Sequence, residues 1–143
     1  MANEAKERLI ASLNEDLALE LAGIVHSVFN ASTAGGMLGH ELRELLQKEM
    51  PIEIKHAQFL ADKIAILGGT PTTSIPKIEV TADVGRMIDD SILMEWKIVE
   101  RLRERASQAE TYGDIGLKVR LEELIADGTD HANDLQRLVG LNQ

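Results

Sequence analysis

Ile52-Glu53-Ile54-Lys55-His56-Ala57 contains a Glu-x-x-His set around which the rest of the sequence is arranged. It lies inside a long segment with helical spacing. Three residues are close to one helical turn, so Glu53 and His56 project from the same face and can hold one metal ion between them. A Glu and a His at this spacing also occur by chance on solvated helices, so the pair gains weight only from a second copy.

A second copy of the arrangement lies 75 residues further along the chain, with one carboxylate missing. At this offset the positions of the potential ligands correspond as Glu20 to Glu95, Glu53 to Gly128 and His56 to His131. The same offset relates apolar positions, namely Leu13 to Ile88, Leu17 to Ile92, Ile24 to Val99, Leu42 to Leu117, Leu46 to Leu121 and Leu60 to Leu135. The repeat predicts two related helical hairpins that pack against each other.

The composition is that of a helical protein with an aliphatic core. The 143 residues contain no break long enough for a linker, so we expect a single domain over residues 1–143. The hydrophobic fraction of 44% excludes a disordered chain, and the aromatic fraction of 3% favours a core of Leu, Ile, Val and Ala. The absence of Cys excludes disulfides and thiolate metal sites.

The charge and hydropathy pattern restrict the partners. A formal charge of −9 disfavours nucleic acid and anionic membranes and suits the binding of metal cations. Charges interrupt every apolar stretch well short of the ~20 residues that a transmembrane helix needs. The charged N-terminal residues are followed by no long apolar run, so no signal peptide is expected. We expect a soluble, cytoplasmic protein.

Apolar residues at helical spacing predict four helices, over residues 3–32, 40–67, 81–109 and 115–138. Asn3 and Thr81 carry side chains suited to capping the first and third helices. Pro51 predicts a kink or a break near residues 47–50, because an interior proline removes a backbone hydrogen bond. Residues 68–80, rich in Gly, Pro and Thr, predict a long crossover that lets the second and third helices run parallel. The expected fold is all-α, a four-helix bundle with this crossover.

Five residues of the metal-ligand type are expected to point into the bundle: Glu20, Glu53, His56, Glu95 and His131. The first helix should bury the stripe formed by Leu13, Leu17, Ile24, Val28 and Ala31, in which Glu20 falls. Buried, unpaired carboxylates repel one another and are costly, and a cation removes that cost. Carboxylate and imidazole without thiolate suit Fe(II), Mn(II) or Zn(II), and two Glu with two Glu-x-x-His sets is the di-iron carboxylate arrangement. Glu49 is a weaker candidate, since such a Glu more often faces solvent.

On these residues the chain resembles the ferritin-like superfamily, and within it the bacterioferritins and the bacterioferritin-like mini-ferritins. The resemblance spans nearly the whole chain, through residues 13–20, 53–57, 67–71 and 131–135. It implies that Glu20 and Glu95 are terminal ligands, that Glu53 bridges two metals, and that His56 and His131 each bind one. It also implies a ferritin-like bundle that forms dimers, often hollow shells, oxidises Fe(II) with oxygen or peroxide and stores the ferric mineral.

Three departures from the family pattern affect the site and the assembly. Gly128 stands where the second bridging Glu is expected, and Asp127 either substitutes for it as a metal ligand or lies at the rim of the site. Ile54 stands where bacterioferritins have the Met that binds haem, so no haem is predicted there. The sequence ends at Gln143, soon after the fourth predicted helix, so we do not expect the short fifth helix of the larger shells.

Three functions therefore compete. The first is a ferroxidase that oxidises Fe(II) and sequesters iron, the second a ferritin-like protein that binds metal without turnover, and the third a degenerate bundle with a structural role. Gly128 favours the second and third, whereas the five remaining ligands favour the first two. We rank ferroxidase-type iron handling first, in a homo-oligomer that is at least a dimer.

Overall fold

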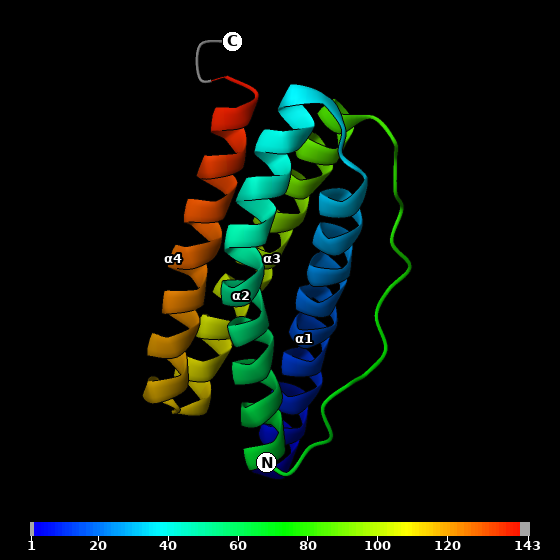
Figure 1. The fold of residues 1–143 in the computed structure, drawn as a ribbon. Coiled ribbons are helices and arrows are strands. Elements are labelled where there is room, and N and C mark those ends of the chain that lie inside the picture. Colours follow the sequence, from blue (N-terminus) through cyan, green and yellow to red (C-terminus); the bar gives the residue numbers. More distant parts are fainter. Residues whose placement is uncertain (1, 141–143) are drawn as a thin grey trace.

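The structure, a computed structural model, describes residues 2–140, and the regular secondary structure in that range is α-helix alone (Figure 1). Its helices are α1 (Ala2–Thr33), α2 (Gly36–Ile66), α3 (Val84–Tyr112) and α4 (Ile115–Leu138). α1 packs chiefly against α2, and α3 against α4. The predicted fold class, an all-α four-helix bundle with a long crossover between the second and third helices, is confirmed.

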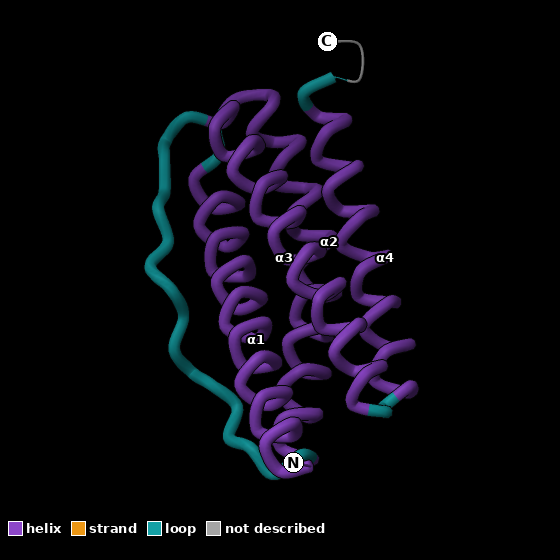
Figure 2. Tube along the Cα trace, turned by 180° about the vertical axis from the view of Figure 1, so that it is seen from behind, coloured by secondary structure: helices purple, strands orange, loops and turns teal. Residues whose placement is uncertain are grey.

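The long connection runs along the outside of the bundle beside α1, as both views show (Figures 1 and 2). It leaves α2 at the end of the bundle where α1 begins and enters α3 at the opposite end. α2 and α3 therefore run parallel, as predicted. Each of the other two connections is a short turn between antiparallel neighbours, α1 to α2 and α3 to α4.

Two features hold the start of this crossover against α1. The Asn14 side chain donates a hydrogen bond to the Thr70 carbonyl at 3.0 Å and accepts one from the Thr72 amide at 2.8 Å. Gly69 approaches α1 so closely that a Cβ there would lie 2.5 Å from Ile10 Cγ2. Only a residue without a side chain fits at this point, which explains the glycine at the beginning of the crossover.

Two predicted helix caps are wrong. α1 begins at Ala2, so Asn3 lies within the helix. α3 begins at Val84 and its N-cap is Asp83, whose side chain accepts a hydrogen bond from the Arg86 amide at 3.0 Å. The Thr81 hydroxyl accepts from the Asp83 amide instead and shapes the turn before the helix. Asp and Thr both cap helices well, so the sequence did not distinguish the two positions.

The predicted break at Pro51 does not occur, because α2 continues from Gly36 to Ile66 as one helix. The carbonyl that loses its helical donor belongs to Gln47, one turn earlier. Both Pro51 and Gln47 are exposed, so water can satisfy this carbonyl without a break in the helix.

The apolar core consists of two clusters, one towards each end of the bundle. The larger includes Leu13, Leu60, Leu102 and Leu121, and the smaller includes Leu42, Ile88 and Leu135. Buried polar side chains lie between them on all four helices. Within residues 2–140 no helix is long and apolar enough to cross a membrane.

Val28, which was predicted to be buried, is 52% exposed. At 3.6 residues per turn, Ser27 lies only about 20° around the helix from Glu20, whereas Val28 lies about 80° away. Ser27 therefore occupies the inward position and is buried.

A buried ion pair joins α1 to α3 within the larger cluster. Asp16 Oδ2 accepts from Arg105 Nε at 2.6 Å, and Oδ1 accepts from Nη2 at 3.1 Å. Both side chains are almost fully buried. Burial raises the pKa of Asp16 despite the facing guanidinium, which indicates that desolvation offsets much of the attraction.

We expect Asp16→Ala to lower the free energy of unfolding by about 3–5 kcal/mol, because it leaves the Arg105 charge buried and unpaired. Replacement of both partners, Asp16→Ala with Arg105→Met, should return the stability to within about 1 kcal/mol of the parent. The exposed pair of Arg103 and Glu100 provides the control, since Glu100→Ala should change stability by less than about 0.5 kcal/mol. Urea unfolding monitored by circular dichroism measures all three, and an equally small effect of Asp16→Ala would contradict this account.

Candidate metal centre

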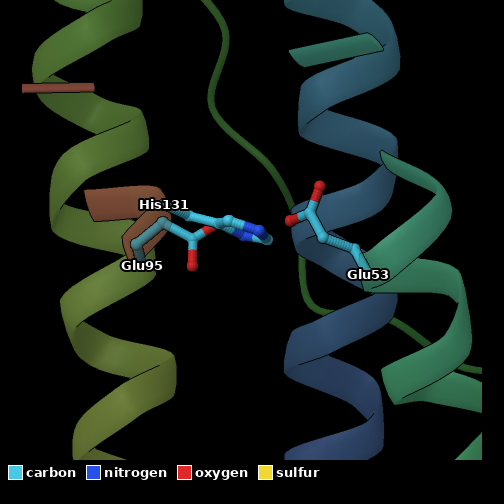
Figure 3. A group of neighbouring side chains, drawn as sticks. All are labelled: Glu53, Glu95 and His131. Atoms are coloured by element: carbon cyan, nitrogen blue, oxygen red, sulfur yellow. The ribbon is translucent and has the colours of Figure 1, made fainter. Parts of the chain in front are cut away.

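Three buried side chains from three helices converge midway along the bundle (Figure 3). Glu53 on α2 faces Glu95 on α3 and His131 on α4. One ligand atom of each lies within 4.8 Å of the other two. The group is therefore narrow enough for all three side chains to bind one ion.

Glu20 and His56 extend this group towards α1 and α2. Glu20 Oε1 lies 3.8 Å from His56 Nδ1, and both side chains are buried. Burial raises the pKa of Glu20, and the carboxylates of Glu95 and Glu53 are close enough to raise it further. The structure thus brings together the five residues that the sequence singled out first, with Glu20 and His56 beside the group of Glu53, Glu95 and His131.

Asp127 lies on the other side of His56, away from this group. Its Oδ2 is 2.8 Å from His56 Nε2, while the Nδ1 of the same ring faces Glu20. The Asp127 side chain is 47% exposed. A carboxylate in this position fixes the orientation and tautomer of an imidazole whose other nitrogen is a ligand.

Glu49 is buried beside His131, although a Glu at such a position more often faces solvent. Its exposed fraction is 4%, and its Oε2 lies 3.2 Å from His131 Nδ1. It precedes Glu53 by four residues, so the two carboxylates lie on one face of α2 a turn apart. The burial of the turn that contains Glu49 could have been inferred from the spacing of Leu42, Leu46 and Glu53, but Pro51 made that turn the least certain part of the helix.

Several polar atoms of this centre have no hydrogen-bond partner. Among the described side chains these include Glu20 Oε1, both carboxylate oxygens of Glu49 and His131 Nδ1. The contact of 3.2 Å between Glu49 and His131 thus brings the atoms close without hydrogen-bond alignment. Buried carboxylate and imidazole atoms without partners fit a cation-binding site, because a cation satisfies several lone pairs at once.

Gly128 lies at the level of the centre on α4 and is buried. A Cβ at this position would lie 2.8 Å from Val99 Cγ2 and 3.7 Å from Glu95 Oε2. The first distance is shorter than real contacts of a Cβ, and the β-branched Val99 has little rotamer freedom in a helix. Neighbouring groups have thus closed the space that a second bridging Glu would need.

Burial and mutual repulsion keep protons on the carboxyl groups of Glu20, Glu49 and Glu53. Burial, followed by the charge of Glu95, raises the pKa of Glu53 to about 8, and burial raises that of Glu49 to about 8 against the opposing effect of His131. Burial also raises the pKa of Glu20 well above its usual value. Burial alone would lower the pKa of His131, but the surrounding Glu95, Glu49 and Glu53 raise it to about 9. Metal binding at neutral pH must therefore displace protons.

A small cavity adjoins the centre on the side of α1 and α3. Its lining includes Glu49, Glu53, Glu95 and His26. The cavity volume is about 10 Å³, which is the room that roughly one water molecule needs. The chain thus leaves space for about one small ion or water beside the three carboxylates.

Comparison with known proteins supports a single family. Residues 10–143 match the family model described as Ferritin-like domain. The chain is 25% identical over 130 residues to a bacterioferritin of Mycobacterium leprae, covering 90% of this chain and 82% of the relative. It is 26% identical over 134 residues to a bacterioferritin of Streptomyces coelicolor, covering 93% and 80%.

Among solved structures, a ferritin-like, diiron-carboxylate protein of Bacillus anthracis matches with 37% identity and a TM-score of 0.91, covering 95% of this chain and 98% of that one. A bacterioferritin of Desulfovibrio desulfuricans has the same fold, with 24% identity and a TM-score of 0.88, covering 96% and 81%.

The pKa shifts predict how the stability of the metal-free protein depends on pH. The folded chain keeps the protons of Glu49 and Glu53 up to about pH 8 and that of His131 up to about pH 9, whereas the usual values are 4.5 and 6.5. The folded state therefore binds more protons than the unfolded state, so stability falls as pH rises from 6.5 to 9. The lowered pKa of His26 acts in the opposite direction but only below 6.5.

We expect the thermal midpoint in the presence of a chelator to fall by at least about 5 °C over this range, since one pKa unit is worth about 1.4 kcal/mol. Glu53→Gln should make the fall shallower, and Glu123→Gln, an exposed change on α4, should leave it unaltered. A midpoint that stays constant or rises between pH 6.5 and 9 would contradict the prediction.

Proposed function

Because the chain belongs to the ferritin-like domain family, we propose that it is a di-metal carboxylate protein that oxidises Fe(II) and sequesters iron. The observation that carries the proposal is the buried group of Glu53, Glu95 and His131, with Glu20 and His56 beside it. Its oxygen and nitrogen donors, without thiolate, suit iron and also Mn(II) or Zn(II). The names of the relatives, bacterioferritins and a diiron-carboxylate protein, support iron as the metal.

We assign one half of the centre to each metal position. Glu20 and His56 Nδ1 would bind the first ion, Glu95 and His131 Nδ1 the second, and Glu53 would bridge them. Asp127 would accept the Nε2 proton of His56 and so keep Nδ1 free for the ion. Two Fe(II) held by these residues would supply the two electrons that, with two protons, reduce one peroxide to two waters.

The remaining side chains of the site control protons and water. Apolar clusters on both sides of the centre exclude bulk solvent, which strengthens the electrostatic interactions within it. Carboxyl groups that are protonated at neutral pH release their protons as a cation enters, so binding is coupled to proton loss.

Gly128 supports a second candidate function, metal binding without turnover. Three carboxylates, those of Glu20, Glu53 and Glu95, leave part of the charge of two divalent ions uncompensated. Metal analysis of the purified protein, followed by oxygen consumption with Fe(II), separates the two functions. Two metals per chain with oxygen uptake would support the ferroxidase, and bound metal without oxygen uptake would support the second candidate.

Mutation of a proposed direct ligand and mutation of a residue that only orients a ligand should have different effects on metal content. Glu53→Ala should remove most of the metal, because it deletes the bridge. Asp127→Ala should weaken one position by about 10–100-fold without abolishing it, as expected for a residue that only orients a ligand. Asp130→Ala, an exposed change on the same helix, is the control. Equal losses for Asp127→Ala and Glu53→Ala would instead make Asp127 a direct ligand, and no loss for either would refute the site.

We further propose that the chain forms at least a dimer, as the family resemblance implies. An apolar groove of about 380 Å³ lies between α1 and α2, and its lining includes Leu21, Ile24 and Ile54. Ile54 is 54% exposed. Its aliphatic side chain offers no atom that could bind haem iron, and we still predict that no haem binds there.

Light scattering at micromolar concentration should give at least twice the mass of one chain. Ile54→Glu should shift the mass towards the monomer, because it buries a charge in the proposed contact. Glu123→Gln, on α4, should leave the mass unchanged. A monomeric parent protein would refute the dimer.

A further inference from the structure

We propose that Glu49 is the fourth metal-binding carboxylate of this centre, replacing from α2 the bridging Glu that α4 lacks at Gly128. This inference rests on the proposed di-metal function and assigns a ligand that the repeat within the sequence does not predict.

Glu49 lies beside the imidazole that would bind the second ion. Its carboxylate lies within 3.2 Å of His131 Nδ1, the nitrogen that also faces Glu95 at 3.8 Å. The side chain lines the same small cavity as Glu53 and Glu95. An ion held by Glu95 and His131 would therefore have Glu49 within reach.

Both carboxylate oxygens of Glu49 are buried without a hydrogen-bond partner. A Glu kept for stability would be expected to have its oxygens satisfied, since a buried acceptor without a partner costs about 1–3 kcal/mol. Glu is also rarely buried unless it is paired. A cation at the His131 half accounts for both oxygens.

The charge of two divalent ions exceeds that of the three carboxylates other than Glu49. Two divalent ions carry four positive charges, and Glu20, Glu53 and Glu95 supply three negative ones. Asp127 does not lie in the group, because its carboxylate is hydrogen-bonded to the outer nitrogen of His56 and is half exposed. Among the described residues Glu49 is the buried carboxylate that completes the balance.

Position 128 itself cannot supply the ligand without further change. Val99 Cγ2 would lie 2.8 Å from a Cβ there. The packing at Gly128 thus leaves α4 without a carboxylate at this level, and the buried Glu49 on α2 supplies one.

The test measures Co(II) binding by calorimetry and by visible absorption. The absorption reports coordination of the ion and needs no turnover. The parent protein should bind two Co(II) per chain. Glu49→Gln and Glu49→Leu should weaken the second Co(II) by at least about 100-fold, beyond the 10–100-fold loss that follows removal of an orienting group. Glu41→Gln, an exposed change on the same helix, should bind as the parent does. Circular dichroism should show that each variant is folded.

Rescue provides the second arm of the test. In a Val99→Ala, Gly128→Glu background there is room for a carboxylate on α4, so adding Glu49→Gln should leave two Co(II) bound. Val99→Ala alone should keep the dependence on Glu49.

The outcomes separate this inference from the proposed function. If the parent binds two Co(II) and Glu49→Gln binds both with unchanged affinity, Glu49 is only an ion-pair partner of His131 and the inference is wrong, while the di-metal centre stands. If folded parent protein binds no Co(II) and no Fe(II), the proposed function fails as well.

Discussion

Four carboxyl groups are buried at one level of this four-helix bundle, and the packing around them has to accommodate that burial. Glu20, Glu49, Glu53 and Glu95 lie close together between the two apolar clusters, away from bulk water. Burial, together with repulsion from neighbouring carboxylates, raises the pKa values of Glu20, Glu49 and Glu53, so that protons keep these three groups uncharged when no cation is bound. The leucine-rich clusters and the ordered crossover supply the stability that tolerates this arrangement.

The two halves of the centre are less alike than the repeat suggests. His56 has Asp127 behind it, but the position that corresponds to Asp127 at an offset of 75 residues is Ile52, which cannot accept a hydrogen bond through its side chain. His131 has Glu49 beside it, and the corresponding position on α4 is Leu124. Each half therefore has one carboxylate that the other lacks. If both halves bind metal as we propose, the two positions should differ in affinity and in proton release.

Much of the fold could be predicted from the sequence because apolar spacing and glycine-rich breaks report the helices directly. The repeat identified Glu20, Glu53, His56, Glu95 and His131, which the structure brings together. The sequence offered little reason to expect Glu49 in the site, because it has no counterpart in the repeat and lies two residues before Pro51. Its burial depends on an unbroken α2. The place of Asp127 depends on which nitrogen of His56 faces inward. The N-cap of α3 could have been either of two equally suitable residues, Thr81 or Asp83. Such choices follow from packing between helices and not from local spacing.

The contact between Val99 and Gly128 affects how this chain can change. A single substitution that placed Glu at position 128 would meet the Val99 methyl before its carboxylate could reach the centre. Such a change requires a smaller residue at 99 first, a step that by itself leaves a gap in the core and brings no ligand. Any route to a carboxylate on α4 at this level therefore passes through a variant that is less stable than the present chain.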